Sequence, residues 1–151
     1  MEQYIGSKIV MAEPMSRGNY MAQATGFITK DMEDLAAPGY KVRYEDGYES
    51  WSPKEVFEAA YRRTDGMSFG LALEAAKKGF RIARHGWNGK GMYVFLADEM
   101  DFHTYADLSE FEESGVMVLG CLCMRTADGS ICPGWLASQT DMLADDWCIV
   151  E

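Results

Sequence analysis

The chain has 151 residues, of which 48% are hydrophobic and 25% are charged, so its composition excludes an intrinsically disordered protein. The formal net charge of −10 opposes non-specific binding to the phosphate backbone of DNA. No apolar run approaches the roughly 18 to 20 residues of a membrane span. The N-terminus also lacks the basic and apolar regions of a secretory signal. We therefore expect no DNA partner, no membrane partner and a cytosolic compartment.

Residues 1–66 predict a small α+β module. Weak alternation predicts a strand over 5–12, whereas Gly, Pro, Asn and acidic residues predict an irregular segment over 13–38. Strict alternation predicts a second strand over 40–44. The turn sequence Glu-Asp-Gly at 45–47 follows it and predicts a β-hairpin.

A helix over residues 54–61 is expected to end this module, before a linker over 62–66. Ser52 is predicted as its N-cap, and Pro53 is predicted at the first helical position, where a missing N–H costs nothing. Helical spacing places three apolar side chains on one face: Val56, Phe57 and Ala60.

Residues 67–151 predict a second α+β domain, in which short helices pack on a small antiparallel sheet. The first helix is expected over 69–78, because Ser68 precedes it as an N-cap and Gly79 follows it as a helix stop. Five strands are predicted over residues 80–84, 92–96, 116–125, 130–132 and 147–150. The acidic stretch 100–114 predicts a short helix or an excursion from the sheet.

The four cysteines do not form the pattern of a metal site. Cys121 and Cys123 are one residue apart, whereas structural zinc sites use pairs separated by about two to four residues. In a strand, this spacing places two small apolar side chains on the same face. Disulfides are not expected in a cytosolic protein either. Because the cysteine spacing does not fit a metal site, we predict no metal ion, and we predict no cofactor.

The common signatures of catalysis are absent from the sequence. There is no nucleophile elbow, P-loop or zinc-protease helix. The glycine-rich stretch 86–91 joins two predicted strands and opens no helix, so it is not a dinucleotide-binding fingerprint. Neither His85 nor His103 has an obvious nucleophile partner. We therefore expect a binding protein and not an enzyme.

Charge is distributed unevenly along the chain. Residues 67–97 contain five basic side chains and one acidic side chain, whereas residues 98–113 contain seven carboxylates and no base. A local positive field favours a small anionic ligand, since such a field acts over about 8 to 10 Å. The alternative interpretation of the basic segment is a solvated helix face with charged strand ends.

The first candidate site is the glycine-rich loop around Trp87. A flat indole beside cations and an amide is a combination that binds nucleotides, because the base stacks, the amide hydrogen-bonds a base edge and the cations pair with phosphate. The side chains that would do this are Arg84, Asn88 and Lys90. The alternative is that Trp87 folds back onto the sheet as part of the core.

The second candidate site follows Trp135. Ser138 is predicted to cap a short helix through residue 144, and the start of a helix offers free N–H groups to an anion. The alternative is that Ser138 caps only its own helix and Trp135 packs in the core. Asp145 and Asp146 lie at the negative end of this helix, which is unfavourable locally and indicates a contact or a turn.

Four segments together resemble a known family. They are MSFGLALEAAKKG at 67–79, RIAR at 81–84, GWNGKGM at 86–92 and WLASQTDMLADDW at 135–147. In order and spacing these segments resemble the phage Thoeris anti-defence type 2 family, from Met67 to the C-terminus. The preceding residues resemble an extra module found in phage proteins, for which no activity is known.

The resemblance implies a sponge that binds cyclic nucleotide immune signals without cleaving them. The implied ligand is the cyclic ADP-ribose isomer made by TIR-domain enzymes, with cyclic dinucleotides as a further class. The implied assembly is a homotetramer with ligand pockets between subunits, in the cytoplasm of the infected bacterial host. The implied ligand-binding residues are Trp87, Asn88, Lys90, Trp135, Ser138, Gln139 and Asp141, to which the local charge pattern adds Arg84.

Two other functions remain open from the sequence. A nucleotide-degrading enzyme would use the clustered carboxylates. An acidic protein–protein inhibitor would cover a basic surface of a host factor with the segment 98–113.

Overall fold

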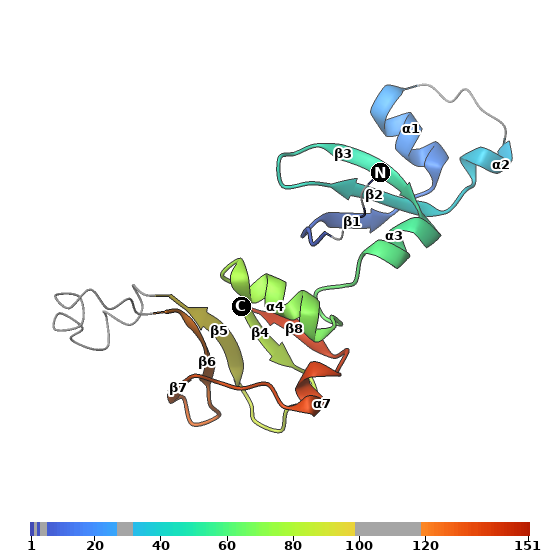
Figure 1. Cartoon of the computed structure of the whole chain (residues 1–151). Helices are drawn as coiled ribbons and strands as arrows, with labels where there is room; N and C mark the ends of the chain where they lie inside the picture. Colours follow the sequence, from blue (N-terminus) through green and yellow to red (C-terminus); the bar gives the residue numbers. More distant parts are fainter. Residues whose placement is uncertain (2, 4–5, 27–31, 99–118) are drawn as a thin grey trace, which may run out of the picture. The chain divides into compact units, whose positions relative to one another are not determined.

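The computed structural model describes residues 1, 3, 6–26, 32–98 and 119–151. The chain divides into two compact units, residues 1–62 and 63–151 (Figure 1). Each unit combines an antiparallel sheet with short helices, which confirms the predicted α+β class. No helix within the described ranges is long and apolar enough to cross a membrane. The acidic stretch predicted at 100–114 lies outside the described residues.

Three antiparallel strands form the sheet of the first unit. They are β1 (Met11–Pro14), β2 (Gly39–Arg43) and β3 (Glu49–Pro53), in the order β1-β2-β3. The predicted hairpin between β2 and β3 is confirmed, and Gly47 adopts a φ of 85° in its turn, where a Cβ would be strained. The predicted strand over 5–12 is placed too early, because β2 provides pairing partners only from Met11 onward.

The segment predicted as irregular contains two helices. They are α1 (Arg17–Thr25) and α2 (Met32–Leu35). Ser16 caps α1 by accepting a hydrogen bond from the N–H of Asn19 at 3.3 Å, and Gly26 ends it in the left-handed conformation. The prediction was wrong because α1 carries only a weak apolar stripe, which leaves its caps as the main local signal.

Helix α3 (Lys54–Ala60) begins at the predicted residue and ends one residue earlier than predicted, and Pro53 occupies the N-cap position expected for Ser52. Ser52 remains extended because it pairs within the sheet, so it does not cap the helix. The ring of Phe57 stacks on Tyr40 with centroids 4.4 Å apart. No residue of α3 is fully buried: Phe57 is half-buried, whereas Val56 and Ala60, predicted on the same face, are exposed.

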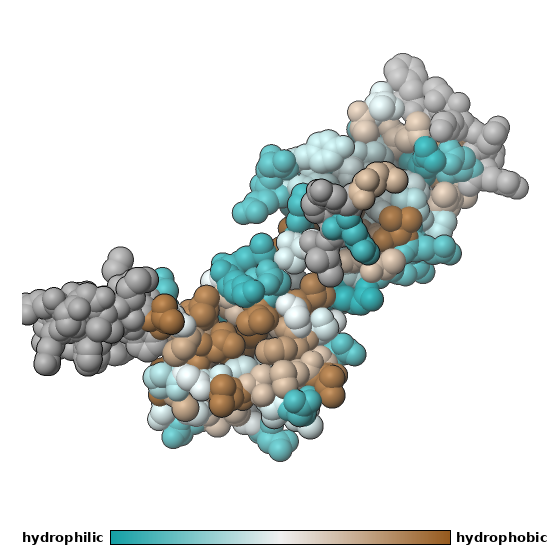
Figure 2. Space-filling model, in the orientation of Figure 1, coloured by the Kyte–Doolittle hydropathy of each residue, from teal (hydrophilic) through white to brown (hydrophobic). Residues whose placement is uncertain are grey.

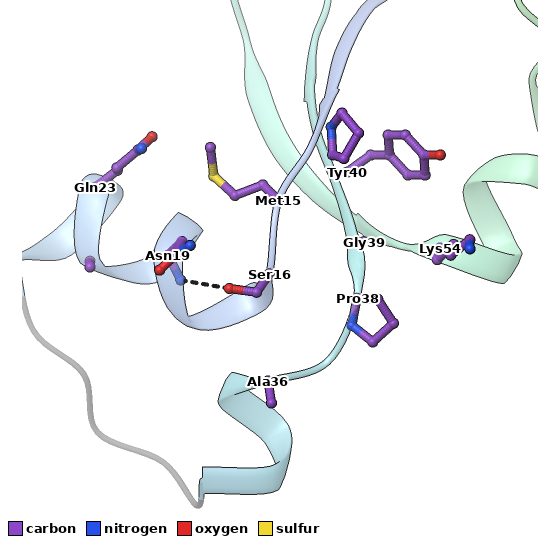
Figure 3. A pocket seen from close by; sticks show the side chains of 11 residues that line it. Met15, Ser16, Asn19, Gln23, Ala36, Pro38, Gly39, Tyr40 and Lys54 are labelled. Carbon is purple, nitrogen blue, oxygen red and sulfur yellow. Dashed lines mark hydrogen bonds between the residues drawn. The ribbon is translucent and has the colours of Figure 1, made fainter.

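A groove of about 770 Å³ lies beside the start of α1 in this unit (Figure 3). Figure 3 shows Asn19 and Gln23 on α1 at one side of the groove and Lys54 on α3 at the other. Its lining is mixed, with apolar residues next to these polar side chains. The remaining lining residues are Pro14, Met15, Ser16, Ala22, Ala36, Pro38, Gly39 and Tyr40. No sequence pattern predicted this groove.

Five antiparallel strands form the sheet of the second unit. They are β4 (Arg81–Arg84), β5 (Tyr93–Ala97), β6 (Cys121–Arg125), β7 (Ile131–Pro133) and β8 (Trp147–Val150). Their order is β7-β6-β5-β4-β8, so the last strand pairs with β4 and not with the preceding strand β7. In this pairing Arg84 lies opposite Trp147. The C-terminal segment is thereby joined to the end of β4.

Helix α4 (Phe69–Lys77) covers the core face of this sheet. Its alanines are small enough for close packing, and three of them are buried against Ile82 and Val94. The buried alanines are Ala72, Ala75 and Ala76. Trp147, at the start of β8, is fully buried in the same cluster. The predicted helix and its stop at Gly79 are confirmed.

The four cysteines are not joined by disulfides. The sulfur atoms of Cys121 and Cys123 lie 3.8 Å apart on one face of β6, as expected for alternate residues of a strand. Among the described residues, no group of three or more His, Cys, Asp and Glu side chains is arranged to hold a metal ion.

Candidate functional site

The fold brings the two segments singled out in the sequence together around three indoles. Trp87 lies in the loop between β4 and β5, whereas Trp135 and Trp147 flank the short helix α7 (Gln139–Met142). The ring of Trp87 meets Trp135 edge-on with centroids 6.1 Å apart, and meets Trp147 in the same way at 5.4 Å. Edge-to-face contacts of this kind are favourable because of the quadrupoles of the rings.

Burial differs between the three rings. Trp147 is fully buried, whereas Trp87 and Trp135 are half-buried and pack on the rim of the core. Trp87 therefore combines features of the two alternatives raised by its sequence context. The ring packs against the core cluster, and part of its surface remains open to solvent.

Asp141 is the polar centre of the site. Its Oδ1 accepts a hydrogen bond from Trp87 Nε1 at 3.1 Å and another from Arg84 Nη1 at 2.8 Å. Its Oδ2 accepts hydrogen bonds from the hydroxyl of Ser138 at 2.6 Å and from the Ser138 N–H at 3.1 Å. The side chain of Asp141 is only 13% exposed, so these donors replace most of its contact with water.

Ser138 and Asp141 form a capping box at the start of α7. The N–H of Asp141 donates to the Ser138 hydroxyl oxygen at 3.1 Å, which completes the reciprocal pair. Burial raises the pKa of Asp141, but the hydrogen bonds from its neighbours outweigh burial and lower its pKa to about 2. The predicted cap is confirmed, and the carboxylate is ionised at neutral pH.

Arg84 lies at the end of β4 between two carboxylates. Its Nε donates to Asp146 Oδ1 at 2.7 Å, and its Nη1 donates to Asp141 and to the backbone oxygen of Thr140. These bonds raise the pKa of Arg84, with the contact to Asp146 contributing most, and the side chain is 17% exposed. One guanidinium with two carboxylates has a net charge of −1. This environment favours a positioning role, and the phosphate contact of Arg84 stays a prediction.

The other predicted side chains lie on the surface around the indoles. Asn88 and Lys90 are exposed on the β4–β5 loop, and Gln139 is exposed at the start of α7. The far end of the loop is anchored, because Arg125 Nη1 donates to the backbone oxygen of Gly91 at 2.8 Å. Asn88 and Lys90 are therefore presented by a loop that is held at its end. Their contact with a ligand stays a prediction.

Two residues of this site had only weak signals in the sequence. Asp146 was noted as an acidic residue at an unfavourable helix end, and it does make a contact, since it binds Arg84. Trp147 was predicted only as part of a strand. The charge of Asp146 opposes the helix dipole, and this is a local signal that sequence reasoning can use. No local pattern predicts that Trp147 lies at the centre of the core.

Comparison with known proteins bears on the same part of the chain. The model of the Thoeris anti-defense 2-like domain matches residues 67–150. A protein of Bacillus phage SP01 named Thoeris anti-defense 2 is 42% identical over 86 residues, which are 56% of this chain and 96% of the relative. This chain belongs to the Thoeris anti-defense 2-like family.

The match covers the elements that build the site. The Thoeris anti-defense 2-like domain of this chain contains α4, all five strands β4 to β8 and the three indoles. Family membership supports a role in phage anti-defence. The sheet of residues 1–62 and its groove lie outside the matched range.

Proposed function

We propose that this Thoeris anti-defense 2-like protein is a sponge, which sequesters a cyclic nucleotide immune signal and does not cleave it. The proposed ligand is the cyclic ADP-ribose isomer made by TIR-domain enzymes, with cyclic dinucleotides as a further class. Binding without turnover removes a scarce signal in proportion to the amount of protein present. The proposed site of action is the cytoplasm of the infected bacterial host.

The observation that carries this proposal is the setting of Trp87. Its indole packs perpendicular to Trp147 and donates a hydrogen bond to Asp141, while it stays half-buried on a loop that also exposes Asn88 and Lys90. A fixed ring loses little conformational entropy when a purine stacks on it. The amide of Asn88 can bind a base edge, and Lys90 is a cation available for phosphate.

A homotetramer with ligand pockets between its subunits is part of the proposal. A nanomolar dissociation constant corresponds to about −12 kcal/mol, whereas a stacked base contributes only ~1–3 kcal/mol. Enclosure between subunits would add the missing contacts and exclude water. Leu136 and Leu143, which flank the site, are 88% and 80% exposed and support an apolar contact there. Figure 2 shows that apolar surface is widespread on the visible face of the unit of residues 63–151.

Native mass spectrometry tests ligand, assembly and turnover together. The full chain is incubated with a pool of cyclic ADP-ribose isomers and cyclic dinucleotides, and the bound species are weighed before and after denaturation. We expect a tetramer that releases an intact cyclic nucleotide. A ligand released with a changed mass would favour the degrading enzyme. Absence of binding would contradict the sponge, and capture of a host protein in a separate pull-down from infected-cell extract would then favour the acidic inhibitor.

A further inference from the structure

Asp146 binds the start of the β4–β5 loop at three points. Its Oδ1 accepts a hydrogen bond from Arg84 Nε at 2.7 Å, and its Oδ2 accepts one from the N–H of Gly86 at 2.8 Å. Its backbone oxygen accepts a hydrogen bond from the N–H of His85 at 3.1 Å. These donors belong to the three residues that precede Trp87. One residue of the C-terminal segment therefore holds the chain on which the indole is mounted.

Glycine at position 86 is part of this fit. A Cβ at this position would lie 2.8 Å from Asp146 Oδ2. This distance is too short for a non-bonded carbon and oxygen, so any side chain would force the loop and the carboxylate apart. The approach of the loop backbone to Asp146 depends on the missing side chain.

Arg84 extends the contact from the loop backbone to the indole itself. Its guanidinium joins Asp146 to Asp141, and the Asp141 oxygen that it contacts is the one that accepts Trp87 Nε1. The guanidinium is planar and its N–H groups point in fixed directions, so it sets the relative placement of the two carboxylates. Displacement of Asp146 would therefore disturb both the start of the loop and the acceptor of the indole.

We propose that Asp146 is a positioning residue for Trp87, acting through Gly86 and through the Arg84–Asp141 pair, without touching the ligand. This inference rests on the proposed function only where it concerns ligand affinity. The inference also predicts that Asp146 sets the orientation of Trp87 in the ligand-free protein, whether or not the proposed function is correct.

The test compares Asp146→Asn with Asp145→Asn in the full chain. Asparagine has the shape of aspartate but only one acceptor oxygen, so it cannot serve both Arg84 and Gly86. Asp145 is the adjacent carboxylate, and it is exposed. The first measurement is the NMR resonance and solvent exchange of the Trp87 indole N–H without ligand. The second measurement is the dissociation constant for a cyclic ADP-ribose isomer.

We expect Asp146→Asn to shift the Trp87 indole resonance, speed its exchange and weaken ligand binding roughly ten-fold or more. We expect Asp145→Asn to change neither quantity. An unchanged indole resonance in folded Asp146→Asn protein would overturn the inference. If Asp146→Asn fails to fold, Gly86→Ala separates loop and carboxylate while keeping both charges, and the same indole measurement decides.

The two proposals fail in different ways. If the wild-type protein binds no cyclic nucleotide, the proposed sponge function is wrong. The indole measurement still tests the positioning role of Asp146, because it needs no ligand. If the wild-type protein binds a cyclic nucleotide and Asp146→Asn binds it equally well, the positioning role is wrong and the sponge stands.

Discussion

The indole nitrogen of Trp87 donates a hydrogen bond to the carboxylate of Asp141, which lies 54 residues further along the chain. The bond connects the β4–β5 loop to the start of α7, and it closes a network in which Arg84 and Ser138 contact the same carboxylate. A ring with its N–H bound and with two other indoles packed against it has few rotamers left. The proposed binding surface is therefore formed before any ligand arrives.

Substitution of Trp87 separates stacking from positioning. Trp87→Ala removes the ring and should weaken binding of a cyclic ADP-ribose isomer by ~1–3 kcal/mol, since stacking is lost. Trp87→Phe keeps a ring but loses the donor to Asp141, so it should lie between the wild type and Trp87→Ala. Isothermal titration calorimetry measures both. Tyr48→Ala removes an exposed aromatic side chain from the first unit and should leave affinity unchanged. Equal affinity of wild type and Trp87→Ala would contradict the stacking role.

The lowered pKa of Asp141 predicts a loss of stability in acid. Its pKa is about 2 in the folded protein, against about 3.9 in an unfolded chain. The unfolded state therefore binds more protons between these values, and stability falls as the pH drops through this window. The contribution at neutral pH is about 2 to 3 kcal/mol. Thermal unfolding followed from about pH 6 down to about pH 2 measures this loss, because the pKa of Asp141 in both states falls within that range.

Asp141→Asn is the matched variant for this measurement. It removes the titrating group but keeps the size of the side chain. The variant should be less stable than the wild type at neutral pH and should lose less stability on acidification. Parallel acid curves for the two proteins would show that another carboxylate controls this transition.

The exposed leucines beside the indoles predict an effect on assembly. Leu136→Ser combined with Leu143→Ser should shift the tetramer expected above toward smaller species, because apolar contact between subunits is lost. Multi-angle light scattering measures the mass. Leu119→Ser is the control, since Leu119 is 75% exposed and precedes β6, whose first residue Cys121 pairs with Ala97 at the end of β5 opposite the β4–β5 loop. An unchanged mass for the double variant would place the interface elsewhere.

Gly39 predicts a stability effect confined to the first unit. A Cβ there would overlap the ring of Trp51 and the backbone oxygen of Ser52. Gly39→Ala should therefore destabilise this sheet by roughly 1–3 kcal/mol, since a rigid ring and a backbone atom must both move. Gly70→Ala is the control, because open space surrounds that position in α4 and alanine favours a helix. Thermal melting followed by circular dichroism measures both variants. A melting temperature of Gly39→Ala equal to that of the wild type would contradict this packing argument.

Local patterns predicted the elements whose signals lie within a few neighbouring residues. The turn at Gly47, the helix stop at Gly79 and the capping box of Ser138 each depend on contacts only a few residues apart. Helix α1 was missed because its weak apolar stripe gives little periodicity, although Ser16 and Gly26 mark both of its ends. Caps carry information about helices that hydrophobic periodicity does not.

Residue type and spacing also placed Trp87, Trp135 and Asp141 in candidate segments, but not in one site. Their contacts depend on the pairing of β8 with β4, which sets Trp147 opposite Arg84. By itself the sequence determined the α+β class, most local elements and the family. Only the tertiary structure decided that Arg84 is bound by two carboxylates and that Asp146 holds the loop, because contacts between residues some 60 positions apart arise from strand pairing and leave no periodic trace along the chain.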